Sequence, residues 1–377
     1  MKVILNVEPI RFPLTGIGRY TYELAKALRT SSCIDELKLF SATRFLQELP
    51  QSDLKDNPVH GLKRMVQKSY LAMEAYRLLM PWLRSKALRK HGDYIYHSPN
   101  FFLPVFPGRK VATFHDLSPF TWSECHDPVK VRYLQKELRT TLNRADRLIT
   151  DSEFTRCELA EFSGLAMDKI HAVPLASAPE FQPYPEATLQ PLLKRYQLEY
   201  QGYSLFVGTI EPRKNIVTLL DAYARLPVSV RRQWPLILTG YQGWQSEAIH
   251  ARIKDAERQG WARYLGFLPA EDLPGLYAGA RLFAFPSLYE GFGLPVLEAM
   301  SSGVPVVCSD SSSLPEVVGS AALMCASMDV ETLTMYLLKG LEDNIWRTQA
   351  VTQGLQQSAG FSWERCAQET IAVYQKL

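Results

Sequence analysis

Several signatures of common protein classes are missing from this chain of 377 residues. No window approaches the ~18 apolar residues that suggest a membrane-spanning helix, and the apolar run at 2–7 ends too early for a signal peptide. The six cysteines include no C-x-x-C pair, so the common zinc and redox motifs are absent and free thiols in a reducing cytosol are expected. The sequence therefore predicts a cytoplasmic protein.

A strong net charge and the catalytic motifs of several large families are lacking as well. The formal net charge is only +3, which gives no large footprint for nucleic acid. There is no D-x-D motif to clamp a metal-bound diphosphate, and no P-loop, G-x-S-x-G or H-E-x-x-H motif. We expect no nucleic-acid partner, no metal and no other cofactor.

One segment is strongly basic. Residues 62–91 combine many Lys and Arg with a single acidic residue, and apolar residues recur between the charges. The pattern predicts an amphipathic helix that Pro81 interrupts. Two interpretations stay open: the helix binds an anionic membrane surface, on the inner face of the cytoplasmic membrane, or it covers a sheet with its charges in water.

Short strand patterns alternate with helical patterns on both sides of a proline-rich stretch at 174–191. Such alternation predicts parallel sheets covered by helices on both faces, and the prolines argue against a helix or a central strand between them. We predict an α/β protein with two doubly wound, Rossmann-like domains that face each other across a deep cleft. The predicted ranges are 1–176 for the first domain, 177–192 for the linker, 193–361 for the second domain and 362–377 for a last helix.

The stretch PSLYEGFGLPVLEAMSSGVPVV (286–307) places two carboxylates around a glycine turn. Glycines let the backbone approach a ligand, and the N-terminus of the following helix suits a phosphate or a hydroxyl-rich ligand. Glu290 would lie on the turn and Glu298 about one helical turn into the helix that follows. Each carboxylate could accept hydrogen bonds from sugar hydroxyls on one side of a diphosphate, so the spacing predicts a nucleotide-sugar site.

Three further groups follow predicted strands. Arg213 and Lys214 come after the strand at 203–208, where two cations suit a diphosphate. Gly16 and Gly18 follow the first strand and resemble part of a dinucleotide fingerprint, but no acid ends the second strand, which argues against a dehydrogenase. We interpret them as a flexible turn facing the other domain. His115, with Asp116 beside it, ends a strand at the predicted cleft and is either structural or a substrate contact.

These segments resemble the retaining glycosyltransferases of the GT-B fold, family 4. The resemblance covers almost the whole chain, with Glu290-x7-Glu298 as its most specific part, and it departs from the family pattern at Thr15 and Thr209. The chain is most similar to bacterial enzymes that add mannose or D-rhamnose from a GDP-sugar to lipid-linked polysaccharide such as O-antigen. The resemblance implies that the last helix crosses back to the first domain.

The resemblance also implies a role for each candidate residue. Glu290 would bind the donor sugar together with the backbone N–H groups of Phe292, Gly293 and Leu294, and Glu298 would bind the ribose. Arg213 and Lys214 would hold the diphosphate, the Gly16–Gly18 turn would close over it, and Gly266 and Phe267 would flank the base. His115 would contact the sugar, and Asp116 the acceptor. Three alternatives remain at this point: a UDP-sugar-dependent enzyme of the same fold, a nucleotide-sugar epimerase and a non-catalytic scaffold.

Overall fold

The computed structural model describes residues 1–14, 16–50, 70–125 and 128–377. The first unit contains β1 (Lys2–Asn6), α1 (Gly16–Thr30), β2 (Glu36–Ser41), β3 (Arg44–Leu46), α3 (Tyr70–Leu88), β4 (Ile95–Ser98), β5 (Arg109–Phe114), α4 (Ser118–Thr121), η1 (Ser123–Cys125), α5 (Pro128–Arg144), β6 (Arg147–Thr150), α6 (Glu153–Ser163), η2 (Met167–Lys169) and β7 (Ile170–Ala172).

The second unit and the last helix follow. They contain α7 (Glu186–Arg195), β8 (Ser204–Val207), η3 (Pro212–Lys214), α8 (Ile216–Arg225), α9 (Val228–Gln233), β9 (Leu236–Thr239), α10 (Glu247–Arg258), β10 (Ala262–Tyr264), α11 (Leu273–Ala278), β11 (Leu282–Phe285), α12 (Leu294–Ser301), β12 (Val306–Ser309), α13 (Leu314–Val318), β13 (Ala322–Cys325), α14 (Val330–Glu342), α15 (Asn344–Ser358) and α16 (Trp363–Tyr374).

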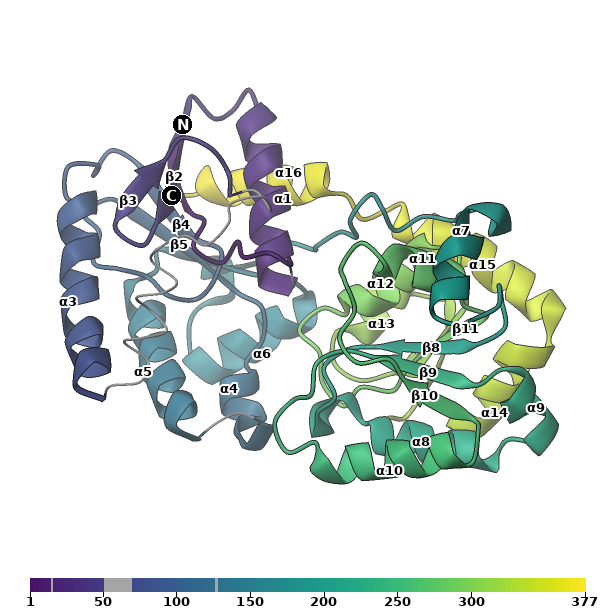
Figure 1. Ribbon diagram of the computed structural model, residues 1–377. Coiled ribbons are helices and arrows are strands. Elements are labelled where there is room, and N and C mark those ends of the chain that lie inside the picture. The colour runs from purple at the N-terminus through teal and green to yellow at the C-terminus, as the bar shows by residue number, and fades with distance from the viewer. Residues whose placement is uncertain (15, 51–69, 126–127) are drawn as a thin grey trace.

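Each unit is built on one sheet, and the two units lie side by side (Figure 1). The strand order is β3-β2-β1-β4-β5-β6-β7 in the first sheet and β10-β9-β8-β11-β12-β13 in the second. All the named strand pairs are parallel except β2 with β3. The chain order reverses beside β1 and beside β8. The predicted fold class, two doubly wound α/β units of the GT-B type, is confirmed.

Side-chain alternation explains why both faces of each sheet are covered. On β1, Val3 and Leu5 belong to the core cluster under α1, whereas Ile4 belongs to the cluster on the opposite face. All three side chains are fully buried. Successive residues of a strand point to opposite faces, so an uninterrupted apolar strand needs helices on both.

The last helix crosses back to the first unit, as predicted. Ser362 caps α16 by accepting a hydrogen bond from the backbone N–H of Arg365, and α16 then lies beside α1 (Figure 1). Near its end, the Tyr374 hydroxyl lies 2.6 Å from Nδ1 of the buried His97 on β4. The helix therefore contributes to the core of the first unit.

Two expectations about proline are wrong. Helix α7 begins inside the proline-rich stretch and contains Pro191, because its Leu189 and Leu193 are buried. Helix α3 continues through Pro81 instead of stopping there. A proline inside a helix removes one backbone hydrogen bond and can kink the helix, but packing of the rest can outweigh that loss.

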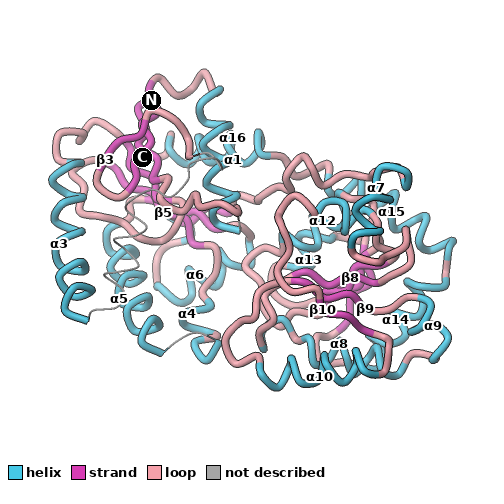
Figure 2. The backbone as a smooth tube through the Cα atoms, viewed as in Figure 1, coloured by secondary structure: helices cyan, strands magenta, loops and turns pink. Residues whose placement is uncertain are grey.

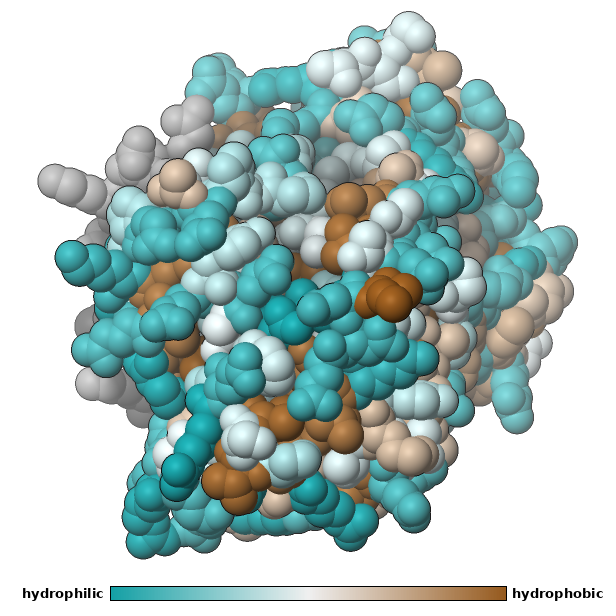
Figure 3. All heavy atoms as spheres, turned by 90° about the vertical axis from the view of Figure 1, so that its right-hand side faces the viewer, coloured by the Kyte–Doolittle hydropathy of each residue, from teal (hydrophilic) through white to brown (hydrophobic). Residues whose placement is uncertain are grey.

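The basic segment 62–91 is only partly within the described residues, since 62–69 lie outside them. In the described part of the chain, no helix has the length and apolar character needed to cross a bilayer. On the outer side of the second unit, the surface is mostly hydrophilic and apolar atoms occur in separate groups (Figure 3).

Candidate active site

The candidate residues gather where the two sheets turn their carboxyl ends toward each other. Loops after the strands converge between the two sheets (Figure 2). The segments that follow β8 and β11, the two strands at the reversal of the second sheet, carry Arg213, Lys214 and Glu290. Open α/β sheets bind ligands at this kind of switch point.

The glycine turn between β11 and α12 is pressed against the first unit. A Cβ atom on Gly291 would overlap the carbonyl oxygen of His115. The carbonyl oxygen of Gly291 also accepts hydrogen bonds from the hydroxyls of Ser152 (2.7 Å) and Thr155 (3.0 Å) on the other unit. Only glycine permits this approach, so the close contact between the two units explains why residue 291 is a glycine.

The turn presents backbone donors at the start of α12. Gly293 has φ +109°, a left-handed conformation that favours glycine, and it is the residue before the helix. The N–H groups of Phe292, Gly293 and Leu294 donate no hydrogen bond to any described part of the chain. Unpaired N–H groups at a helix N-terminus form a site for an anion.

Glu290 is the centre of a buried ion-pair cluster. It is only 7% exposed. Its Oε1 accepts a hydrogen bond from Lys214 Nζ at 2.5 Å, and its Oε2 accepts one from Arg213 at 3.2 Å. Arg213 also donates to Glu211 (2.7 Å) and to the carbonyl oxygen of Tyr289 (2.8 Å). The two acids and two bases therefore neutralise one another before any ligand arrives.

The cluster keeps Glu290 ionised. Burial opposes ionisation, but Lys214 and Arg213 outweigh it and hold the pKa of Glu290 below its ordinary value. Arg213 is held on several sides, whereas Lys214 has one hydrogen-bond partner among the described residues. An ammonium group has three donors, so Lys214 keeps two for a ligand. Arg213 positions Glu290 more than it offers itself to a phosphate.

Glu298 lines a separate cavity of about 270 Å³. Tyr241 and Phe267 stack there with ring centroids 3.9 Å apart, next to Gly266, which has φ +72°. The first unit contributes Gly16 and Arg19 to the same cavity. Burial raises the pKa of Glu298 to about 7, against smaller opposing effects of Tyr277 and Arg19.

Gly16 and Gly18 belong to the first turn of α1, not to a flexible loop. A Cβ atom on Gly18 would lie 3.0 Å from the carbonyl oxygen of Pro9, whereas one on Gly16 would meet nothing within 4 Å. Close packing of the preceding segment against Gly18 therefore holds this turn, which explains why the expected flexible turn is instead helical.

His115 lies at the junction but has no ring nitrogen left for a ligand. Nδ1 is 2.7 Å from Asp151 Oδ2, and Nε2 is 2.8 Å from the carbonyl oxygen of Pro99. Burial disfavours the charged ring, but Asp151 outweighs it and raises the pKa of His115. Asp116 accepts hydrogen bonds from the backbone N–H and hydroxyl of Ser118 through Oδ1. Both residues have structural partners in this arrangement.

A second, larger cavity of about 590 Å³ lies in the first unit and shares Gly16 with the first cavity. Its wall mixes polar side chains with aromatic rings. The lining includes Asn6, Glu8, Arg84, Asn100, Phe102, Tyr133 and Glu137. Alternating donors, acceptors and ring faces suit a polyhydroxylated ligand.

Comparison with known proteins decides the family. Residues 194–357 match the family model "Glycosyl transferases group 1", and residues 14–176 match "Glycosyltransferase Family 4". The chain is 48% identical over its full length to the full-length O-antigen chain mannosyltransferase B of Escherichia coli. The chain belongs to the family 4 glycosyltransferases.

A more distant relative and two solved structures are also similar to this glycosyltransferase, and the structures show that the fold is shared. O-antigen chain mannosyltransferase RfbU of Salmonella typhimurium is 23% identical over 85% of this chain and 86% of its own. The structure of Anabaena Alr3699/HepE in complex with UDP-glucose superposes with a TM-score of 0.74 at 16% identity, covering all of both chains. WaaG, a glycosyltransferase of lipopolysaccharide biosynthesis, gives 0.71 at 15% identity over 98% of this chain and 99% of its own. The predicted family is confirmed.

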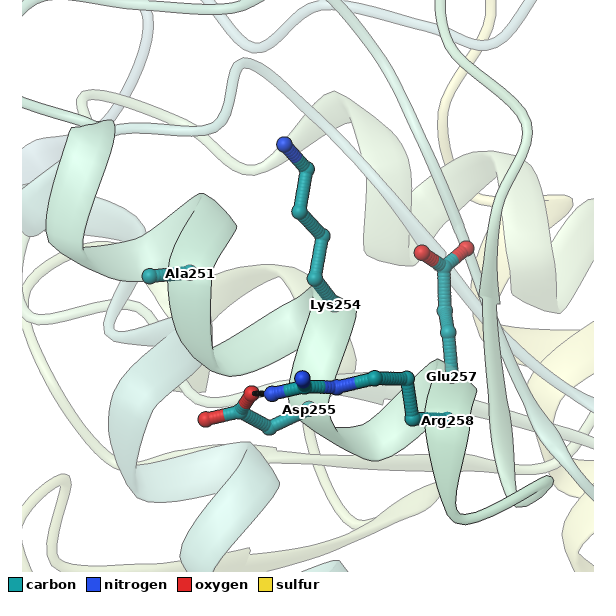
Figure 4. A pocket seen from close by; sticks show the side chains of 5 residues that line it. All are labelled: Ala251, Lys254, Asp255, Glu257 and Arg258. Carbon is teal, nitrogen blue, oxygen red and sulfur yellow. Dashed lines mark hydrogen bonds and ion pairs between the residues drawn. The ribbon is translucent and has the colours of Figure 1, made fainter.

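Another hollow of this glycosyltransferase lies away from the glycine turn. It is lined by α10 alone, through Ala251, Lys254, Asp255, Glu257 and Arg258. Arg258 points to Asp255 and pairs with it (Figure 4). Side chains from one exposed helix do not converge on a ligand, so we assign no site there.

Sequence reasoning missed Arg19 as a site residue. It lies three residues after Gly16 on α1, and residues spaced by three share a face of a helix. Both line the cavity of Glu298. The signal in the sequence was a lone arginine after a glycine pair, which without the facing unit looks like a surface charge.

Proposed function

We propose that the protein transfers a mannosyl residue from GDP-mannose to a hydroxyl of a lipid-linked saccharide, with retention at the anomeric carbon, during synthesis of a bacterial cell-surface polysaccharide. The observation that carries the proposal is that the Glu290 turn and the Glu298 cavity lie together at the switch point of the second sheet. It is made in a chain that is 48% identical over its full length to O-antigen chain mannosyltransferase B. GDP-D-rhamnose is the second candidate donor.

The donor would bind across the junction of the units. The guanine would lie against Phe267 and Gly266, and the ribose hydroxyls would donate to Glu298. The sugar hydroxyls would donate to Glu290, and the diphosphate would accept from Lys214 and from the N–H groups at the start of α12. Glu290 is already oriented by Lys214 and Arg213, so little reorganisation is needed on binding.

Charge develops on the diphosphate as the bond between it and the anomeric carbon breaks. Preorganised donors facing that charge supply a large part of the rate enhancement. The acceptor oxygen bonds to the anomeric carbon on the same face, and its proton passes to a phosphate oxygen of the leaving GDP. In this scheme no protein base is required, which is consistent with the two hydrogen bonds that occupy the ring of His115.

The acceptor would occupy the 590 Å³ cavity of the first unit. That cavity meets the donor cavity at Gly16, so a sugar hydroxyl held there would reach the anomeric carbon past the first turn of α1. We also propose that no metal takes part. Addition of a chelator should then leave turnover unchanged.

We also propose that helix α3 contacts the membrane surface. Leu79 and Trp82 on α3 are each more than half exposed, and the Lys86 ammonium lies 5.2 Å from the Trp82 ring centroid. Apolar and cationic groups side by side suit the boundary of an anionic bilayer. Co-sedimentation with anionic but not neutral vesicles, reduced in Trp82→Ala, would support it; equal sedimentation with both would contradict it.

Calorimetric binding of GDP-mannose, GDP-D-rhamnose, UDP-glucose, GDP and UDP tests the donor. We expect saturable binding of the GDP compounds only, lost in Glu298→Ala. Preference for UDP compounds would overturn the donor assignment but keep the reaction. An isomerised sugar from donor alone would indicate an epimerase, and a folded protein that binds none would favour a scaffold.

A further inference from the structure

The cationic side chains assigned to the diphosphate are already neutralised. Arg213 pairs with Glu211 and Glu290, and Lys214 pairs with Glu290. This cluster carries as many acids as bases. A nucleoside-diphosphate sugar adds a negative charge on each phosphate, and a buried charge without compensation is costly.

One cation without a close ion-pair partner lines the cavity of Glu298. Among the described residues that form its wall, Arg19 is the only Lys or Arg, and it faces Glu298 from the other unit. Its ion-pair partner in the described chain is Glu23, one turn along α1, at a loose 3.8 Å. The guanidinium side chain is 23% exposed, so it is sheltered at the cavity but not fixed by a close partner.

The position of Arg19 on its helix adds a second argument. Gly16 opens α1 and lines the same cavity, and a Cβ atom there would meet nothing within 4 Å. The first turn of a 15-residue helix therefore lines the cavity together with Arg19. A helix N-terminus and an arginine on the same face both favour an anion.

We propose that Arg19 binds the diphosphate of the donor from the first unit, so that the nucleotide joins the two units. This inference rests on the proposed function and adds a residue of the first unit to the donor site. Arg213 then serves mainly to orient Glu290, and Lys214 and Arg19 approach the phosphates from opposite units.

Nucleotide fragments of increasing charge test this role. Calorimetry measures the binding of guanosine, GMP and GDP to the native protein and to Arg19→Gln. Where guanosine binds too weakly for direct titration, its affinity is measured by competition. A hydrogen bond to a charged group typically contributes enough to predict a ~10- to 100-fold loss of GDP affinity. Guanosine affinity should change less than about twofold, and Arg19→Lys should recover part of the loss.

The matched control is Arg29→Gln. Arg29 lies at the other end of α1, where it donates to the carbonyl oxygen of Gln47 at 3.0 Å, and its replacement should leave all three affinities unchanged. A GDP affinity within twofold of native in Arg19→Gln would overturn the proposal. An equal loss for guanosine and GDP would also overturn it, because it would assign Arg19 to Glu298 and the ribose.

Failure of the proposed function gives a different result. If the native protein binds uridine nucleotides instead, the same series with uridine, UMP and UDP tests Arg19 and only the base assignment fails. If the folded native protein binds neither series, the proposed function fails and the role of Arg19 fails with it.

Discussion

Replacement of Glu298 by glutamine should stabilise the protein in a pH-dependent way. Burial raises the pKa of this carboxyl from 4.5 to about 7. The folded protein therefore holds the proton more tightly than the unfolded chain, and stability falls as pH rises through that window. At ~1.4 kcal/mol for each tenfold change in proton affinity, the difference between the two pKa values corresponds to about 3.5 kcal/mol.

The expected result is a gap between native protein and Glu298→Gln that opens with pH. It should be small at pH 5 and reach about 3.5 kcal/mol at pH 8.5, or roughly 7–14 °C in the unfolding temperature of a domain of this size. Thermal unfolding of both proteins between pH 5 and pH 8.5 measures it. Glu364→Gln, at an exposed position on α16, controls for loss of a surface carboxylate.

A stability difference that does not change with pH would refute the reasoning, and so would a Glu298→Gln protein less stable than native at pH 8. In the proposed site the same variant should lose donor affinity, because an amide is a weaker acceptor than the carboxylate that would bind the ribose hydroxyls. Stability gained with function lost is the pattern expected where a buried charge is kept for binding.

Three further outcomes follow from the site. Lys214→Ala should lower turnover ~10²- to 10³-fold, because in the proposed site it removes donors that would face the leaving group. Lys254→Ala on α10 is the matched control, and unchanged turnover in Lys214→Ala would contradict the assignment. Gly291→Ala should reduce both unfolding temperature and turnover, because the added Cβ would overlap a backbone oxygen. Gly16→Ala, where a Cβ would meet nothing within 4 Å, should keep the native unfolding temperature. Equal changes of unfolding temperature in the two variants would refute the packing argument. The raised pKa of His115 predicts that the stability from its pair with Asp151 declines as pH rises above 6.5 through the raised value. Burial raises the pKa of Asp151 as well, so the pair also weakens in acid as that carboxyl takes up a proton. Unfolding of Asp151→Asn against native between pH 6 and pH 9 measures the decline, and a difference that grows with pH over this range would contradict it.

Much of the fold followed from local patterns. A strand pattern such as 282–285 is apolar on both faces, and in parallel sheets that requires helices on both sides. The glycine turn at 290–293 and the cap at Ser362 were predictable because each depends on residues only a few positions apart. Pro81 and Pro191 were misjudged because the packing of a helix can outweigh one lost hydrogen bond.

The charged site was only half predictable. The sequence by itself determined which residue types lie in the segments after the strands: Lys214 after β8, Glu290 after β11, and Gly16 with Arg19 after β1. Only the tertiary structure decided that Lys214 and Glu290 are ion-pair partners and that Arg19 faces Glu298 from the other unit. Strand order and the docking of the two units bring these positions together, and burial then sets their charge states, because the free energy of a charge depends on everything around it and not on its neighbours in the chain.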